Sequence, residues 1–271
     1  MARRGRHNPF IWTLVGISLA GLVLLTLPTV ALLVRAFDAR DVLSDVQARA
    51  TLREALVLSL TTSLVSLALI VLAGIPIAYV LARGQFPGVR ILDALVDLPI
   101  ILPPAVAGIA LLAAFGRRGL LGDSFDRFGV NIAFSTTAVI IAQVFVSAPF
   151  FIRTARAGFS RIDHSIEEAA ADLGASPARV FWRITLPLSR ASLIAGAVLA
   201  WARALGEFGA TIMFAGNREG VTQTMPLAIY ERFGAGDLET AVVLSAILLG
   251  TSVVFLVVVR LLGEPAIQRP A

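Results

Sequence analysis

Apolar residues along this chain gather in six long runs that polar segments separate. A membrane-spanning helix needs about 20 mostly apolar residues, and these runs meet or approach that length. We therefore expect an all-α polytopic membrane protein with about six transmembrane helices, forming a single transmembrane domain over residues 1–271. The predicted spans are residues 10–34, 55–82, 98–115, 132–152, 191–214 and 240–259.

Two of the runs contain residues that disturb a simple helix. The third carries Pro99, Pro103 and Pro104, and proline removes a backbone donor, so this run is expected to break or kink. In the fifth run, Gly206 and Gly209 would let another helix approach closely.

Composition agrees with lipid as the solvent for most of the chain. Only 15% of residues are charged, against about 25% in soluble domains. Cysteine is absent, which excludes disulfides and thiol catalysis. All 23 basic residues are arginine, so the chain lacks the lysine of a P-loop. If ATP drives this protein, another chain binds the nucleotide.

Arginine distribution predicts the orientation in the membrane, because cytoplasmic segments carry an excess of basic residues. With the N-terminus inside, inner segments hold 13 arginines and outer segments hold nine. We therefore expect both termini and the polar segment 153–190 to be cytoplasmic.

That segment also has local helix signals. Ser165 and Glu168 have the spacing of a capping box, which predicts a short helix over residues 166–173. Gly174 suits the left-handed residue that ends such a helix.

A second short helix is predicted directly after this bend. Ser176 and Pro177 suit its N-cap and first position, and it should end before Pro187, which lacks an N–H group. On these signals alone, an amphipathic helix pair lying at the membrane surface remains an alternative.

The residues of this segment also follow a longer signature, which resembles the EAA loop of binding-protein-dependent ABC importer permeases. The matching residues are Glu168, Ala169, Ala170, Gly174, Ile184, Leu186 and Pro187. The resemblance implies a coupling helix that docks into a groove of a separate cytoplasmic ATPase. Glu168 would pair with a basic residue of that ATPase or cap its own helix, and both roles stay open.

Four further stretches are similar to molybdate permease subunits, with sulfate and thiosulfate permeases as relatives. They are DLPIILPPAVAG at 97–108, FGRRGLLG at 115–122, RALGEFGATIMFAGN at 203–217 and TQTMPLAIY at 222–230. The resemblance implies a type I ABC importer permease in the cell (inner) membrane that carries a tetrahedral oxyanion. It favours molybdate, with sulfate, thiosulfate and tungstate as alternatives.

The same resemblance implies partners and no chemistry of its own. The chain would form a homodimer with cytoplasmic ABC ATPase subunits and an extracytoplasmic oxyanion-binding protein, within the lipid bilayer. We expect no cofactor, metal, catalytic residue or nucleic acid partner, since ATP would be bound by the ATPase.

Charged residues inside a span are costly and usually face protein or water. Arg203 and Glu207 lie one helical turn apart in the fifth run. They form either a self-satisfied structural pair or, with Pro103 and Pro104, part of an anion pathway. By contrast, Asp93 and Asp97 are expected at a solvated helix end.

Two functions of another class remain possible from the sequence. An ion-coupled secondary carrier would take up its substrate without ATP. A polytopic membrane enzyme would need a catalytic cluster, and the sequence presents no Ser/His/Asp, carboxylate or histidine group suited to that role.

Overall fold

The computed structural model describes residues 9–84 and 87–263, and every regular element within these residues is helical. Four single helices are long and apolar enough to cross a membrane. They are α1 (Pro9–Asp38), α2 (Val46–Arg83), α6 (Thr136–Ser160) and α13 (Leu238–Gly263).

Two sharply bent helix pairs raise the number of candidate spans to six if each pair counts as one. They are α3 (Val89–Ile101) with α4 (Pro104–Phe115), and Pro177–Leu188 with α10 (Arg190–Leu205). The all-α fold with about six spans is therefore confirmed.

The remaining elements are short and connect or extend these helices. They are η1 (Arg40–Ser44), α5 (Gly122–Arg127), α7 (His164–Asp172), α8 (Pro177–Val180), the π-helical turn η2 (Phe181–Thr185), α9 (Leu186–Leu188), α11 (Gly209–Phe214) and α12 (Met225–Gly234).

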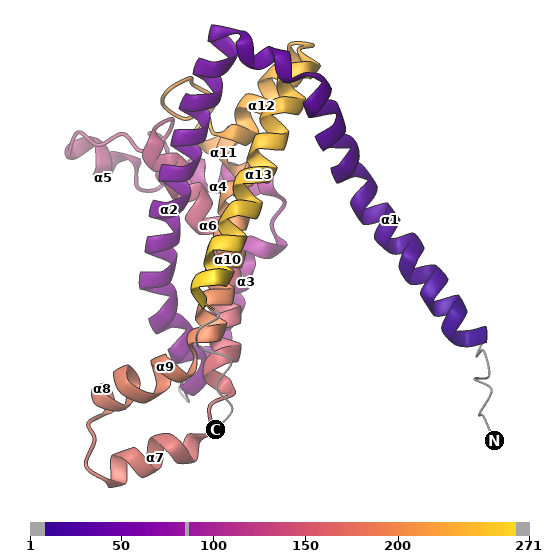
Figure 1. Cartoon of the computed structure of the whole chain (residues 1–271). Coiled ribbons are helices and arrows are strands. Elements are labelled where there is room, and N and C mark those ends of the chain that lie inside the picture. Colours follow the sequence, from indigo (N-terminus) through magenta and orange to yellow (C-terminus); the bar gives the residue numbers. More distant parts are fainter. Residues whose placement is uncertain (1–8, 85–86, 264–271) are drawn as a thin grey trace, which may run out of the picture.

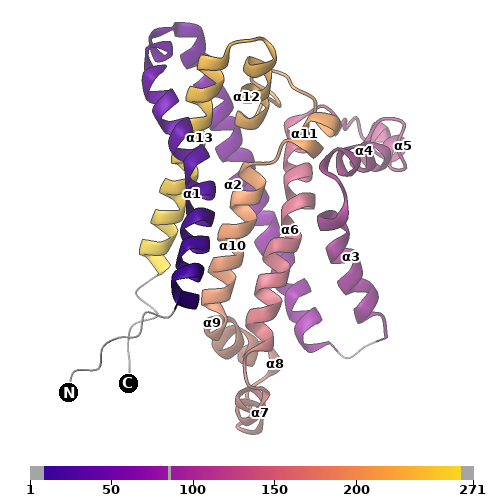
Figure 2. The ribbon, with the colours of Figure 1, turned by 90° about the vertical axis from the view of Figure 1, so that its right-hand side faces the viewer.

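The centre of the bundle is formed by α2, α6 and α10, which pack side by side (Figures 1 and 2). Small polar side chains join the first two of these helices. The Ser66 hydroxyl donates to Gln143 Oε1 at 2.9 Å, and Gln143 Nε2 donates to the Thr62 hydroxyl at 3.2 Å. Buried amide and hydroxyl groups thus satisfy one another where water is scarce.

The first helix leaves the bundle. α1 packs against α13 and η1 but diverges from the other helices toward its N-terminal end (Figure 1). Its apolar side chains, such as Leu24 and Leu25, are exposed, which suits a helix surrounded by lipid or by a partner chain.

The two ends of the bundle differ. The hairpin formed by α7, α8, η2 and α9 lies at one end, which we call the hairpin end, and α11 and α12 lie toward the other (Figures 1 and 2). α1 starts and α13 finishes on the side of the hairpin end (Figure 1). The predicted cytoplasmic termini fall on residues 1–8 and 264–271, outside the described residues.

Several helix bounds differ from the apolar runs. α2 begins at Val46 rather than at residue 55, because the Asp45 side chain accepts from the Gln47 N–H and caps a polar first turn that hydropathy does not detect. The run over 98–115 is not one helix, since the chain bends by 117° between α3 and α4. The run over 191–214 is interrupted between α10 and α11.

Candidate functional site: the helical hairpin and the paired helix breaks

The hairpin begins with a helix cap at a different residue from the one predicted. Asp163 is the N-cap of α7, and its carboxylate accepts from the Ser165 N–H at 3.0 Å. This backbone hydrogen bond lowers the pKa of the Asp163 carboxyl below its ordinary value. The predicted Ser165–Glu168 capping box is therefore wrong, because the helix starts at His164 and places Ser165 inside its first turn.

The bend after α7 agrees with the sequence. Gly174 has φ +85°, the left-handed conformation that glycine adopts without strain. Ser176 and Pro177 occupy the N-cap and first position of α8.

The predicted end of the second hairpin helix before Pro187 is wrong. Helical conformation continues through Pro187 to Leu188. The π-helical turn η2 directly precedes this segment and changes the hydrogen-bond register there, which accommodates the missing N–H of proline.

The residues of the EAA signature are divided between an exposed face and the bundle. Glu168, Ala169, Gly174 and Pro187 are exposed, and Ala170, Ile184 and Leu186 are half-buried. Leu186 packs against the buried cluster that contains Ala78 and Phe151. Exposed Leu173 and Trp182 add large apolar side chains to the hairpin surface. The hairpin therefore presents small, apolar and acidic groups to its surroundings.

The residue next to Glu168 was not predicted from the sequence to have a role. Glu167 is only 8% exposed, whereas Glu168 is 71% exposed. The Glu167 carboxylate accepts from the Thr185 hydroxyl at 2.6 Å and lies 3.2 Å from an Arg83 nitrogen. A helical wheel could have found it, because Glu167 and Ala170 share the inner face of α7.

Two interrupted helices meet at the centre of the candidate pathway. Pro103 is the N-cap of α4 and Pro104 is its first residue. A Cβ placed on Gly209, the first residue of α11, would lie 2.5 Å from Pro104 Cβ. One placed on Gly108 would lie 2.6 Å from the Ala210 carbonyl oxygen. Glycine at both positions lets α4 and α11 touch, so the two breaks lie against each other.

Arg203 and Glu207 flank the break between α10 and α11. An Arg203 guanidinium nitrogen lies 2.6 Å from Glu207 Oε2, and Glu207 Oε1 accepts from the Ala210 N–H at 2.7 Å. The carboxylate is 1% exposed and the guanidinium side chain 29% exposed. The two side chains pair as their spacing suggests, but they do not share one helix, because α10 ends at Leu205. Glu207 instead joins the end of α10 to the first turn of α11.

The two aspartates of α3 are also placed differently from the expectation. Asp93 pairs with Arg156 and Asp97 pairs with Arg153, both on α6. The two carboxylates are partly exposed, as a solvated position predicts, but they lie within α3 rather than at its end, and each has a cationic partner. Their partners Arg153 and Arg156 lie about one helical turn apart on α6, a different helix. A pattern within one segment of the sequence does not reveal such a pairing.

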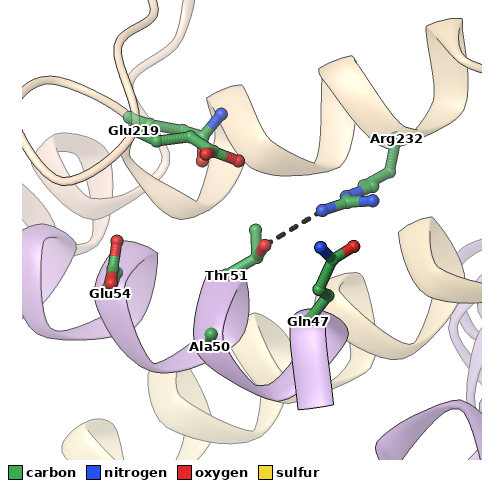
Figure 3. Close-up of a pocket in the computed structure, with 7 residues that line it drawn as sticks. Gln47, Ala50, Thr51, Glu54, Glu219 and Arg232 are labelled. Carbon is green, nitrogen blue, oxygen red and sulfur yellow. Dashed lines mark hydrogen bonds between the residues drawn. The ribbon is translucent and has the colours of Figure 1, made fainter. Parts of the chain in front are cut away.

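The end opposite the hairpin contains a polar pocket of about 260 Å³ (Figure 3). Its lining comes from the first turns of α2, the loop before α12 and α12 itself, and consists of Gln47, Ala50, Thr51, Glu54, Glu219, Gln223 and Arg232. Arg232 donates to the Thr51 hydroxyl at 2.9 Å. With two carboxylates and one guanidinium the lining is net acidic, so it is poorly suited to hold a dianion.

Bent membrane helices that enclose buried ion pairs, with a helical hairpin at one end of the bundle, define a polytopic permease-type membrane protein. A family model described as "Binding-protein-dependent transport system inner membrane component" matches residues 70–264. The chain therefore belongs to this family of importer permeases.

The relatives of this chain within the family include molybdenum and sulfate transport permeases. The molybdenum transport system permease protein ModB of Mycobacterium tuberculosis is 46% identical over 231 residues, covering 85% of this chain and 86% of the relative. The Escherichia coli K12 protein of that name is 44% identical over 65% of this chain and 78% of the relative. The sulfate transport system permease protein CysW of Synechococcus elongatus is 37% identical over 92% of this chain and 88% of the relative.

Solved structures share the fold. A bacterial ABC transporter that imports alginate matches with a TM-score of 0.72 at 17% identity, covering 95% of this chain and 96% of that chain. The methionine transporter MetNI in an inward-facing conformation matches with a TM-score of 0.61 at 18% identity, covering 82% and 96%. These likenesses confirm the fold of a type I ABC importer permease.

Proposed function

We propose that this chain is the permease subunit of an ATP-driven importer for molybdate. The observation that carries the proposal is the 46% identity to molybdenum transport permeases along 85% of the chain. Sulfate permeases match at 36% to 38%, so sulfate, thiosulfate and tungstate are the alternative cargoes.

The proposed assembly is a homodimer with two cytoplasmic ATPase subunits and an extracytoplasmic oxyanion-binding protein. The family description names binding-protein dependence. The absence of lysine from the chain supports a separate ATPase, because a P-loop requires lysine. In this assembly the hairpin end faces the cytoplasm.

The hairpin would couple ATP binding by the ATPase to transport. Ala169 and the exposed edge of Ala170 permit close approach to a groove on the ATPase, and Glu168 is free of the helix-capping role that Asp163 fills. Glu168 would therefore pair with a basic residue of the ATPase. ATP binding would favour one of two states of the dimer, which is coupling between distant sites.

The anion would pass the paired helix breaks. Its hydration must be replaced by cationic or N–H donors, and Arg203 offers a guanidinium that is partly open. Glu207, Pro103 and Pro104 would hold this region in shape. Contact with the anion would be weak, since a site that binds tightly releases slowly, and the binding protein would make the selection.

The test is uptake of radiolabelled molybdate and sulfate by the reconstituted complex. We expect Arg203→Gln to slow uptake of both anions by a similar factor, whereas Arg260→Gln, at the exposed end of α13, transports at the parental rate. Because Arg203→Gln leaves buried Glu207 unpaired, the double variant Arg203→Gln/Glu207→Gln is measured as well.

Three outcomes would contradict parts of the proposal. Parental uptake by the double variant would make the ion pair structural only. A change confined to the molybdate-to-sulfate ratio would assign selection to the permease. Uptake that follows an ion gradient and ignores ATP would indicate a secondary carrier.

A further inference from the structure

The hairpin contains one charged side chain that faces inward. Glu167 lies beside exposed Glu168 but is buried, and both of its carboxylate oxygens have partners. Oε1 accepts from the Thr185 hydroxyl of η2 at 2.6 Å, and Oε2 lies 3.2 Å from the Arg83 guanidinium. Thr185 is fully buried. Glu167 therefore joins α7 both to the second arm of the hairpin and to α2.

Arg83 completes the connection from the side of the bundle. It lies in the last turn of α2, and the nitrogen that faces Glu167 also donates to the Ile162 carbonyl at 3.1 Å. Ile162 belongs to the link between α6 and α7. A single guanidinium thus holds α2, this link and α7 together. We call Arg83, Glu167 and Thr185 the hairpin cluster.

Aromatic rings pack next to the hairpin cluster and tie the same elements together. The Tyr79 ring of α2 lies 5.7 Å from the Phe159 ring of α6 and 5.0 Å from the Phe181 ring of η2, both edge-on. Edge-to-face contacts at these distances are favourable. The end of α2, the end of α6 and the hairpin are consequently one packed unit.

A buried ion pair stabilises the position of a hairpin less than apolar packing of similar size would. Taking two charges out of water costs free energy that apolar packing does not, so buried ion pairs contribute little net stability. Their strength lies in geometry, because removing one partner leaves the other charge buried and uncompensated. In addition, the Arg83 Nε atom is buried without a hydrogen-bond partner. The arrangement therefore favours a fixed position of α7 over maximal stability.

We propose that the hairpin cluster makes α7 and α2 move as one body, so that displacement of the hairpin by the ATPase is transmitted to the transmembrane bundle. The inference rests on the proposed docking of the hairpin. Glu167 contacts neither the ATPase nor the anion, and it is a positioning residue. The ATPase would displace α7 through its contact with Glu168 on the outer face. The contact of Glu167 with Arg83 on the inner face would then displace α2 with it.

The experiment is a double-mutant cycle in the full complex with its ATPase subunits, using Arg83→Gln, Glu167→Gln and the double variant. Three quantities are measured: ATPase co-purification, ATP hydrolysis and anions transported per ATP. We expect each single variant to assemble and hydrolyse ATP but to transport at least about fivefold less per ATP, the lower end of typical coupling between sites. The double variant should be no worse than either single, because the two residues act as a unit.

A second measurement reports on the hairpin directly. The chain has no native cysteine, so spin labels can be placed at exposed Leu72 on α2 and exposed Leu173 after α7. The parental chain should give a narrow distance distribution, and Glu167→Gln a broader one. Thr185→Val removes only the hydroxyl contact and should broaden the distance distribution as well. Because this change is milder, the test does not depend on a Glu167 variant that fails to fold.

Glu168→Gln is the matched control, one residue away on the exposed face. It should leave the spin-label distance unchanged while weakening ATPase association. The proposal is overturned if Glu167→Gln keeps both the parental transport per ATP and the narrow distance distribution. If Glu168→Gln and Gly174→Val leave ATPase association intact, the docking assignment fails instead, which is a separate result.

Discussion

Charged side chains of the helices connect segments that are separate in the sequence. Arg83 and Glu167 join α2 to α7, and Arg203 and Glu207 join the end of α10 to α11. The aspartates of α3 pair with arginines of α6. Where the carboxylate is buried, as at Glu167 and Glu207, such a pair fixes geometry more than it adds stability. This explains why charges are tolerated in a chain that is otherwise so apolar.

Gly174 is a residue at which backbone conformation, rather than space, limits substitution. Its φ is +85°, and an added Cβ would meet no atom within 4 Å. Gly174→Val should therefore strain the hairpin by about 1–3 kcal/mol and reduce ATPase association and uptake, with membrane insertion intact. Gly174→Asn is the control, since asparagine tolerates the left-handed region. Normal assembly and uptake in the valine variant would contradict the role of the bend.

At the scale of elements, the important feature is that two helices are broken at the same place. The 117° turn between α3 and α4 and the interruption between α10 and α11 meet at Pro104 and Gly209. Irregular backbone at membrane depth is tolerated where it is buried in protein or lines a water-filled cavity. The contact between α4 and α11 is therefore a structural requirement for any pathway here.

Gly209→Ala tests this contact with a single added methyl group. The new Cβ would lie 2.5 Å from Pro104 Cβ, so we expect a loss of about 1–3 kcal/mol from overpacking and slower uptake. Gly250→Ala in α13 is the matched control for Gly209→Ala, because the Cβ added at Gly250 would meet no atom within 4 Å. Thermal unfolding of the purified proteins in detergent provides the comparison. Equal midpoints for the two variants would show that α4 and α11 can separate without cost.

At the scale of the molecule, the two ends of the bundle have different chemistry. The hairpin end presents Glu168, small residues and apolar side chains on a compact helical unit. The opposite end contains the net acidic pocket beside α12 (Figure 3). The two ends of the bundle therefore differ in charge and in the apolar side chains that they expose.

Orientation can be measured with two matched serine-to-cysteine variants in this naturally cysteine-free chain. Ser165 lies in α7 and Ser124 in α5, and both are exposed. An impermeant thiol reagent should label Ser124→Cys in intact cells and Ser165→Cys only after permeabilisation. Labelling of Ser165→Cys from outside intact cells would show that the orientation is opposite to the one proposed.

The fold class and the family could be predicted from the amino-acid sequence alone. Apolar runs of membrane length follow from the bilayer's thickness, and the signature from Glu168 to Pro187 showed the family by its resemblance to the EAA loop. Gly174 was placed correctly because a left-handed bend is a property of the residue. Pro103 and Pro104 likewise identified the break in the third run.

Which charged side chains pair with one another became visible only in the assembled helices. Arg83 and Glu167 are 84 positions apart, and Asp97 and Arg153 are 56 apart, so no local pattern could pair them. The cap at Asp163 and the passage of the helix through Pro187 were also missed, because η2 and the packing of Leu186 override local preferences. Within lipid a charge must find a partner wherever the fold brings one near, and that requirement is satisfied only once the helices are assembled.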